Sequence, residues 1–133
     1  MESPSYLTVL DVVAIHDRIL ERMAEPLAPL RDADRLEAAL ARPENAAHYR
    51  GADIVEQAAI LAVSVSRAQA FVEGNKRTAY FCAIVFLREN GWRFAGPPLE
   101  FARRLTALAT PTAGTAENAA EFIQWFRTQV SRQ

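Results

Sequence analysis

The sequence predicts an all-α protein, folded as one compact domain of about six helices around a buried central helix. Three observations predict this class. Along most of the chain, apolar residues recur at the i, i+3, i+4, i+7 spacing of a helix with one buried face. Proline, glycine and capping residues separate these stretches. One stretch, Lys76 to Asn90, is apolar nearly all round, which is typical of the helix at the centre of a small α domain.

Length and composition fit a single domain spanning residues 1–133, with 50% hydrophobic and 23% charged residues. The net charge of −1 indicates neither a nucleic-acid-binding nor a membrane-binding surface. Cys82 is the only cysteine, so no internal disulfide is possible. The N-terminus lacks the pattern of a signal peptide, and the longest apolar run, Ala79 to Leu87, is too short to span a bilayer. We therefore expect a cytoplasmic protein.

The first helix is expected to begin at Thr8, because Thr8 and Asp11 have capping-box spacing. Its buried stripe comprises Val9, Val12, Val13, His16, Ile19, Leu20 and Met23. His16 lies in the middle of the stripe, which favours a hydrogen-bonded core histidine over a catalytic one. Pro26 and Pro29 end this helix.

The second helix is expected to be capped by Asp32 or Asp34 and stopped by Pro43. It would bury Leu36, Ala39 and Leu40. Residues 48–51 then look like loop, with His48 on the surface. The third helix begins at an N-cap formed by Asp53 with Glu56 and runs to about Ala68, burying Ile54, Ala58, Leu61 and Val65.

The central helix is expected to end at Asn90-Gly91, and Trp92 to Phe94 to be extended. Cys82 inside that helix reads as a core residue rather than a nucleophile. Pro97-Pro98 would start a helix through Leu99, Leu105 and Leu108, followed by a turn over residues 111–114. The last helix would begin near Thr115 and bury Ala119, Phe122, Ile123, Phe126 and Val130. Trp125 falls off that stripe and is interpreted as packing at its rim.

The stretch from Gln69 to Arg77, QAFVEGNKR, joins the third helix to the central one. Gly74 stands alone between two strong helical patterns and marks a sharp turn. Lys76 and Arg77 then fall in the first turn of a helix, beside backbone N–H groups that have no partner within the helix. This combination suits an anion such as phosphate, with Glu73 placed to hold a divalent metal. The alternative is a solvated corner, although cations at a helix N-terminus oppose the helix dipole.

The same stretch resembles the signature loop of the Fic/Doc family, roughly His-x-Phe-x-(Asp or Glu)-(Gly or Ala)-Asn-(Gly or Lys)-Arg. The residues that match are Phe71, Glu73, Gly74, Asn75, Lys76 and Arg77. The continuation RTAYFCAIVFLRENGW and the upstream stretches YLTVLDVVAIHDRIL and LRDADRLEAALARP are also similar, especially to the death-on-curing (Doc) branch. The resemblance covers most of the chain up to about Phe94 and implies the small helical fold of that family.

One departure is large. The histidine of the family motif is replaced by Gln69, and its neighbours are Ala68 and Ala70, where the Doc branch commonly has asparagine and proline. In active relatives this histidine takes the proton from the attacking hydroxyl, which a glutamine amide cannot do near neutral pH. Three explanations stay open: natural divergence, a variant made inactive for production, or another base such as His16 or Glu73. The changes at Ala68 and Ala70 favour divergence.

The resemblance implies a nucleotide-dependent transfer, with ATP and Mg²⁺ as cofactors. Fic proteins transfer AMP to a hydroxyl side chain, whereas the Doc branch phosphorylates a threonine of elongation factor Tu. A lysine after the motif asparagine, here Lys76, goes with the second activity. By this resemblance Asn75, Lys76, Arg77 and the backbone near Gly74 hold phosphates, Glu73 holds Mg²⁺, and Phe71 anchors the loop.

Two classes of function therefore remain. One is a Doc-like toxin that arrests translation, with an activity that Gln69 impairs. The other is a pseudo-enzyme that binds nucleotide or protein without chemistry. The inhibitory helix that some Fic proteins carry, with the pattern Ser/Thr-x-x-x-Glu-Gly/Asn, does not occur in this sequence. We therefore expect control by a small antitoxin whose tail folds as a helix into a groove near the loop.

Overall fold

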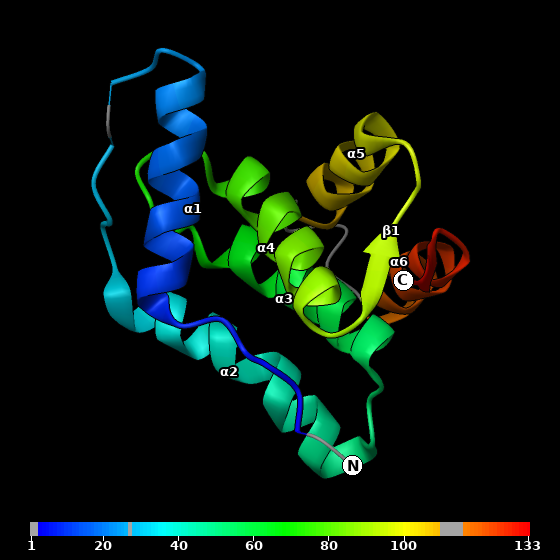
Figure 1. Ribbon diagram of the computed structural model, residues 1–133. Helices are drawn as coiled ribbons and strands as arrows, with labels where there is room; N and C mark the ends of the chain where they lie inside the picture. The colour runs from blue at the N-terminus through cyan, green and yellow to red at the C-terminus, as the bar shows by residue number, and fades with distance from the viewer. Residues whose placement is uncertain (1–2, 27, 110–115) are drawn as a thin grey trace.

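The computed structural model describes residues 3–26, 28–109 and 116–133. The described chain is helical with two short strands, and none of its helices is long and apolar enough to cross a membrane. The elements in chain order are α1 Val9–Arg22, α2 Ala33–Arg50, α3 Ile54–Ala68, α4 Asn75–Glu89, β1 Trp92–Phe94, α5 Pro98–Ala109, α6 Ala116–Thr128 and β2 Val130–Arg132. The predicted all-α class is confirmed (Figure 1).

Helices α3 and α4 lie side by side at the centre, with α1 and α2 on one side and α5 and α6 on the other (Figure 1). The expected central helix, α4, therefore shares the centre with α3. Alanines and serines on α3 allow this close packing: Ala58, Ala59, Ala62 and Ser66 are all buried. Phe81 on the opposite face of α4 is 43% exposed, so α4 is not buried all round.

Caps fix the starts of the first three helices. The Thr8 side chain accepts from the Asp11 N–H and the Asp11 side chain accepts from the Thr8 N–H, which confirms the predicted capping box of α1. Asp32 caps α2 and Asp53 caps α3 in the same N-terminal position. Met23, expected on the buried stripe of α1, is instead the C-cap residue and is 40% exposed.

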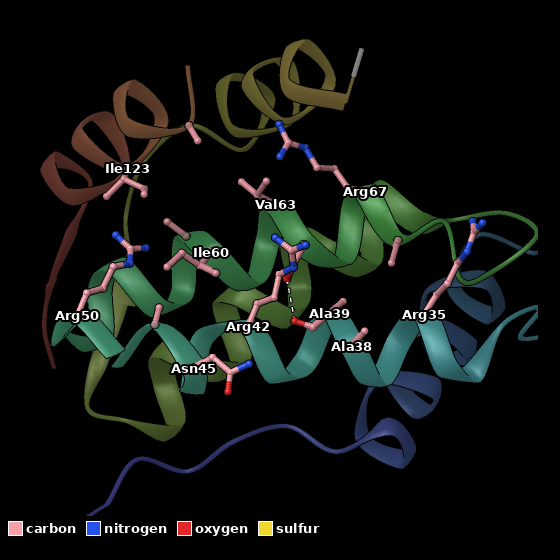
Figure 2. A pocket seen from close by; sticks show the side chains of 15 residues that line it. Arg35, Ala38, Ala39, Arg42, Asn45, Arg50, Ile60, Val63, Arg67 and Ile123 are labelled. Atoms are coloured by element: carbon pink, nitrogen blue, oxygen red, sulfur yellow. Dashed lines mark hydrogen bonds between the residues drawn. The ribbon is translucent and has the colours of Figure 1, made fainter. Parts of the chain in front are cut away.

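Helix α2 contradicts the prediction that Pro43 stops it. Pro43 lies inside the helix and is buried, and the helix continues to Arg50, so residues 48–50 are helical rather than loop. A proline leaves the carbonyl four residues earlier without its N–H partner. Here that carbonyl, of Ala39, accepts a hydrogen bond of 2.9 Å from the Ser64 hydroxyl on α3 (dashed line in Figure 2). Helix α2 ends instead at Gly51, which has the left-handed conformation (φ 69°).

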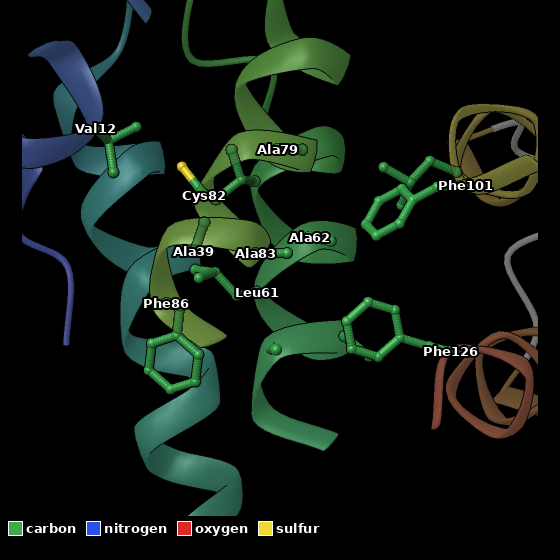
Figure 3. Packing of buried hydrophobic residues seen from close by; sticks show 14 of the residues in the cluster. Val12, Ala39, Leu61, Ala62, Ala79, Cys82, Ala83, Phe86, Phe101 and Phe126 are labelled. Carbon is green, nitrogen blue, oxygen red and sulfur yellow. The ribbon is translucent and has the colours of Figure 1, made fainter. Parts of the chain in front are cut away.

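The core runs through the molecule from α1 to α6. Val12 reaches it from α1, Ala79, Cys82 and Ala83 line it from α4, and Phe101 and Phe126 close it from α5 and α6 (Figure 3). Phe122 adds to an aromatic cluster with Phe101 and Phe126. Trp125 packs at the edge of this cluster with the Arg104 guanidinium over its ring, which confirms its rim position.

The C-terminal part agrees with the expectations in one helix and differs at its last strand. Helix α5 begins at Pro98 and runs through Leu99, Leu105 and Leu108 as expected. Leu99 is 85% exposed, because the buried face of α5 runs through Phe101, Leu105 and Leu108. Val130 is not on α6 but in β2, which pairs antiparallel with β1 in the register Phe94 to Val130. The expected turn over residues 111–114 and the helix start near Thr115 lie outside the described residues.

Candidate functional site

The loop between α3 and α4, residues 69–74, opens on a cleft that it shares with the end of α1. The cleft has a volume of about 390 Å³. It brings together most of the predicted site residues, and is lined by Ile19, Leu20, Met23, Glu25, Gln69, Glu73, Gly74, Asn75, Lys76 and Arg77. Phe71 lies beneath the loop instead, 1% exposed, as its expected anchoring role requires.

Asn75 holds the loop in shape. Its Oδ1 accepts from the Phe71 N–H at 3.0 Å, and its Nδ2 donates to the Phe71 carbonyl at 2.8 Å. The residue is only 8% exposed. The Asn75 side chain was expected to hold a phosphate, but in this arrangement its amide is used to fold the loop back on itself. The groups that remain open to the cleft are the backbone N–H groups at the start of α4 and the side chains of the next two residues.

His16 supports the loop from below. The imidazole is fully buried and stacks on Phe71, with ring centroids 3.8 Å apart. Its Nε2 donates to the Glu73 carbonyl at 2.8 Å, because a carbonyl oxygen can only accept. A Cβ added at Gly74, which has φ 83°, would meet the ring at 3.4 Å. The prediction of a hydrogen-bonded core histidine is confirmed, and the ring does not line the cleft.

A connector between α1 and α2 braces the loop from the side. The backbone N–H groups of Arg31 and Asp32 donate to the Ala70 carbonyl at 2.7 and 3.0 Å, and Leu30 forms a β-bridge with Phe71. The Arg31 guanidinium donates to the Gln69 carbonyl at 2.6 Å. Sequence reasoning missed Arg31, and also Glu25 in the cleft. Neither belongs to a helical stripe, so no periodic signal points to them.

Gln69 ends α3 in the left-handed conformation, with φ 50° and ψ 40°. Residues other than glycine adopt this conformation at a cost of roughly 1–2 kcal/mol, and it recurs at functional sites. The hydrogen bonds of the Arg31 guanidinium and of the Gln69 side chain, whose Nε2 donates to the Ser66 carbonyl at 2.9 Å, hold it there. The residue at this position therefore projects at a fixed point on the edge of the cleft.

The N-terminus of α4 faces the same cleft without a cap. Gly74 is the N-cap residue, and no side chain bonds the free N–H groups there. Lys76 and Arg77 are exposed in the first turn. The Arg77 guanidinium contacts the Met23 sulfur at the end of α1, whereas Lys76 has no ion pair or hydrogen bond among the described residues. Two cations and a free helix N-terminus thus converge on one open volume.

Comparison with known proteins identifies the architecture around this loop. Residues 6–87 match the model of the Fic/DOC family. The chain belongs to the Fic/DOC family. The match ends within α4, so α5, α6 and both strands lie outside it. The resemblance read from the loop motif is confirmed.

Two curated relatives belong to the Doc branch. "Protein kinase doc" of Escherichia phage P1 is 34% identical over 82 residues, which cover 61% of this chain and 64% of the relative. "Toxin Doc" of Mycolicibacterium smegmatis is 43% identical over 70 residues, which cover 50% of this chain and 52% of the relative. The chain therefore spans less than two thirds of the length of either relative.

The carboxylates of this Fic/DOC cleft suit a magnesium ion that is also bound by a nucleotide better than an ion held by protein side chains alone. Within the described ranges, no group of three His, Cys, Asp or Glu residues comes close enough to hold a metal. Two exposed carboxylates, Glu25 and Glu73, line the cleft with Lys76 and Arg77. Mg²⁺ is commonly held by one or two carboxylates together with the phosphates of its nucleotide. The cleft offers that donor set.

Cys82 is not among the residues that line the cleft. It is fully buried in α4, and burial, together with the charge of Asp11, raises the pKa of its thiol to about 12. A thiolate is therefore absent at neutral pH. The prediction that Cys82 is a core residue is confirmed.

Proposed function

We propose that this chain is a Doc-like toxin of a toxin–antitoxin pair. Its scaffold would transfer a phosphoryl group from ATP to a hydroxyl of a protein of the elongation factor Tu class, and Gln69 would slow that step. One observation carries the proposal: Gln69 and the uncapped, cationic N-terminus of α4 face the same cleft. Membership of the family and the names of the two relatives, a kinase and a toxin, support it.

Binding would depend on α4 and on the loop backbone. The free N–H groups after Gly74 would bind phosphate oxygens, and Arg77 would add a charged contact. Lys76 would neutralise the charge that spreads over the transferred group. Catalysis of phosphoryl transfer depends mainly on such electrostatic stabilisation and on positioning. Glu73 would hold Mg²⁺, which would screen the phosphates when bound. Each of these groups is exposed to the cleft or lines it.

Proton removal is the step for which the chain is poorly equipped. A general base typically contributes a factor of about 10²–10⁴, and the Gln69 amide cannot act as one. His16 does not replace it, because its ring is buried under the loop and its Nε2 is bonded to the Glu73 carbonyl. The Glu73 carboxylate lines the cleft and is the remaining candidate. We therefore expect slow transfer and intact nucleotide binding.

The alternative is a pseudo-enzyme that binds nucleotide or protein without chemistry. The specific observation in its favour is the role of the Gln69 side chain in the fold. Its amide donates to the Ser66 carbonyl and so helps to end α3. A side chain used in this way acts as a helix cap rather than as a catalyst.

Phosphate transfer from labelled ATP to elongation factor Tu separates the two functions. The chain is compared with Gln69→His, Gln69→His/Lys76→Ala and Glu73→Gln, and ATP–Mg²⁺ binding is measured in parallel by calorimetry. We expect the histidine variant to transfer at least about 100-fold faster than the native chain. We expect Lys76→Ala to remove that gain.

Two results would count against the toxin kinase. If Gln69→His transfers no faster while ATP still binds, the pseudo-enzyme is the better description. If the native chain transfers rapidly and neither Lys76→Ala nor Arg77→Ala slows it, the assignment of the site is wrong. Loss of residual transfer in Glu73→Gln, with ATP–Mg²⁺ binding unchanged in calorimetry, would identify Glu73 as the substitute base rather than only as a metal ligand.

A groove beside the cleft suits the antitoxin that we propose as partner. It lies between α1 and α4 and has a volume of about 490 Å³. Its apolar surface comes from Ile15, Ile19, Phe81 and Val85, and its charged rim from Arg18, Arg22 and Arg77. An amphipathic helix carrying acidic residues would match both features. Since Arg77 also lines the cleft, such a helix would obstruct the phosphate site.

Co-purification with the small protein encoded beside this gene tests the partner. We expect Phe81→Glu to abolish the complex, because it places a charge on the apolar surface. Leu99→Glu is the matched control, since Leu99 is also an exposed hydrophobic residue but lies on α5. Recovery of the protein alone, with no small protein encoded beside it, would contradict the antitoxin proposal.

A further inference from the structure

A second groove lies on the face of the molecule formed by α2 and α3, bounded on one side by α6 (Figure 2). It has a volume of about 560 Å³. None of its lining residues lines the cleft at the signature loop or the groove between α1 and α4. A function for this surface is therefore separate from the transfer chemistry proposed above.

The floor of the groove is made of small and branched apolar side chains. Ala38 and Ala39 on α2 face Ile60 and Val63 on α3, and Ile123 approaches from α6 (Figure 2). The alanines keep the floor low, which leaves a channel along the line where the two helices meet. Such a channel accepts the apolar side chains of a further helix, as in helix-in-groove recognition.

The rim of the groove is strongly cationic. Arg35 and Arg50 stand toward its two ends, with Arg42 and Arg67 between them on facing helices (Figure 2). No acidic residue is among the described residues that line it. The four arginines give this face a positive charge, although the chain as a whole has a net charge of −1. An anionic partner would be attracted to it.

The four arginines differ in how far their charge is compensated. Arg50 forms an ion pair with Glu56 at 2.8 Å, and Arg35 one with Asp32 at 3.4 Å. Both pairs lie at the ends of the groove. An external carboxylate would have to compete with these acids for the two end arginines.

The charges of the two middle arginines are not compensated by an acidic side chain among the described residues. Arg67 donates two hydrogen bonds to the Leu108 carbonyl, at 3.3 and 3.1 Å, which is a neutral acceptor. Arg42 has no ion pair or hydrogen bond in the part of the chain that the structure describes. Guanidinium groups of this kind readily form bidentate pairs with carboxylates.

We propose that this groove docks an acidic amphipathic helix of a partner protein. Apolar side chains of that helix lie on the alanine floor, and carboxylates on its flanks pair with Arg42 and Arg67. Single-stranded nucleic acid suits the surface less well, because bases stack on aromatic side chains and none is among the described lining residues. The combination of cationic rim and apolar floor selects a protein segment with both kinds of residue.

A display library of randomised helical peptides of about 18 residues, roughly five turns, supplies the probe. Selection is made on the full chain, with counter-selection against Arg42→Glu/Arg67→Glu. We expect enriched peptides to carry Asp or Glu beside apolar residues at i, i+3, i+4 and i+7 spacing. Their affinity, measured by fluorescence anisotropy, should fall on the order of tenfold or more in the double variant and weaken with salt.

Matched controls keep the result specific to this groove. Arg88→Glu reverses an exposed arginine on α4, and Phe81→Glu alters the groove between α1 and α4; both should bind the selected peptides like the native chain. Thermal unfolding checks that the double variant is folded. No enriched peptide, peptides without acidic residues, or unchanged binding by the double variant would each overturn the proposal. So would tighter binding of a single-stranded RNA, or a dimer of this chain that the double variant breaks.

Discussion

His16 links three parts of the site through one buried ring. The ring stacks on Phe71, donates a hydrogen bond to the Glu73 carbonyl and lies against Gly74. The loop that carries the signature residues therefore rests on α1 and not only on the helices that it joins. The site thus consists of buried residues that hold the loop, His16, Phe71 and Asn75, and of exposed residues that line the cleft, such as Lys76 and Arg77.

Replacing His16 by alanine should destabilise the protein and loosen the loop. The variant leaves a cavity under Phe71 and an unpaired carbonyl at Glu73, so we expect the free energy of unfolding to fall by about 2–4 kcal/mol. His48→Ala is the matched control: His48 is exposed on α2, and its loss should change stability by no more than about 0.5 kcal/mol. Urea unfolding measures both. Equal effects would show that the contacts of His16 carry little energy.

Gly74→Ala tests the turn itself. An alanine there must adopt a positive φ and also place its Cβ 3.4 Å from the His16 ring. Gly51→Ala also requires a positive φ, of 69°, but its Cβ would have no atom within 4 Å. This control variant should lower the free energy of unfolding by about 1 kcal/mol. We expect Gly74→Ala to cost more than this control and to weaken ATP binding, which Gly51→Ala should leave unchanged. Calorimetry and urea unfolding of the two variants provide the comparison.

At the scale of elements, Pro43 shows why helix ends are hard to read from sequence. The proline was predicted to stop the helix because it removes a hydrogen-bond donor, but the Ser64 hydroxyl supplies a substitute donor from another helix. That serine is 25 residues from Ala39, and nothing in the local sequence joins them. The start of the same helix is set by the local cap Asp32, one of the two aspartates that the sequence indicated.

Ser64→Ala should cost about 1–2 kcal/mol, because it leaves the Ala39 carbonyl buried without a partner. Ser66→Ala is the control, since the buried Ser66 hydroxyl has no hydrogen-bond partner among the described residues and its loss should be near neutral. Pro43→Ala restores an N–H at the matching position of α2. In that background the cost of Ser64→Ala should shrink, and a thermal-unfolding double-mutant cycle measures the coupling. If the effects of Pro43→Ala and Ser64→Ala on stability simply add, the Ser64 hydroxyl does not replace the hydrogen bond that Pro43 removes.

The loop illustrates a second limit of sequence reasoning. Its location, its glycine turn and its exposed cations followed from residue types and spacing. The bonding of the Asn75 amide to Phe71 did not, because an asparagine beside cations reads equally well as a ligand for an anion. Only the fold shows which of its neighbours the amide reaches.

At the scale of the whole molecule, polar contacts between residues far apart in the sequence add to the packing of the core. Asp53 caps α3 and also receives two hydrogen bonds from Arg127 on α6, at 2.8 and 3.2 Å. Strands β1 and β2 close the same end, in a pairing of residues far apart in the sequence. β2 was missed because so short a strand has no signal apart from its partner.

The Asp53–Arg127 pair should make stability depend on pH. The hydrogen bond from Arg127 lowers the pKa of Asp53 below its usual value in the folded state. The stabilisation that the ionised Asp53 carboxylate gives to the folded state is therefore present above the unfolded pKa of about 4, and is lost as the pH falls through the lower folded pKa. Asp53→Asn keeps a capping side chain but removes the charge, and should cost at most about 1 kcal/mol at pH 7, since the pair is largely exposed.

Unfolding free energies of the native chain and Asp53→Asn, measured from about pH 7 to about pH 3, test this dependence. We expect the difference between the two proteins to shrink as the pH falls. Glu37→Gln, at an exposed acid on α2, should show little difference at any pH. A difference between native and Asp53→Asn that stays constant over the range would exclude a role for the charge.

The left-handed backbone at Gln69 has a consequence for how this protein can evolve. Arg31 and the end of α3 fix that backbone, and histidine adopts the left-handed conformation more readily than most residues. In the genetic code, glutamine and histidine codons differ only in their third base. One substitution in the DNA therefore exchanges an amide for an imidazole at the edge of the cleft, on a backbone conformation that both residues can adopt. Under the proposed function, that single base change would add or remove the general base of the transfer reaction.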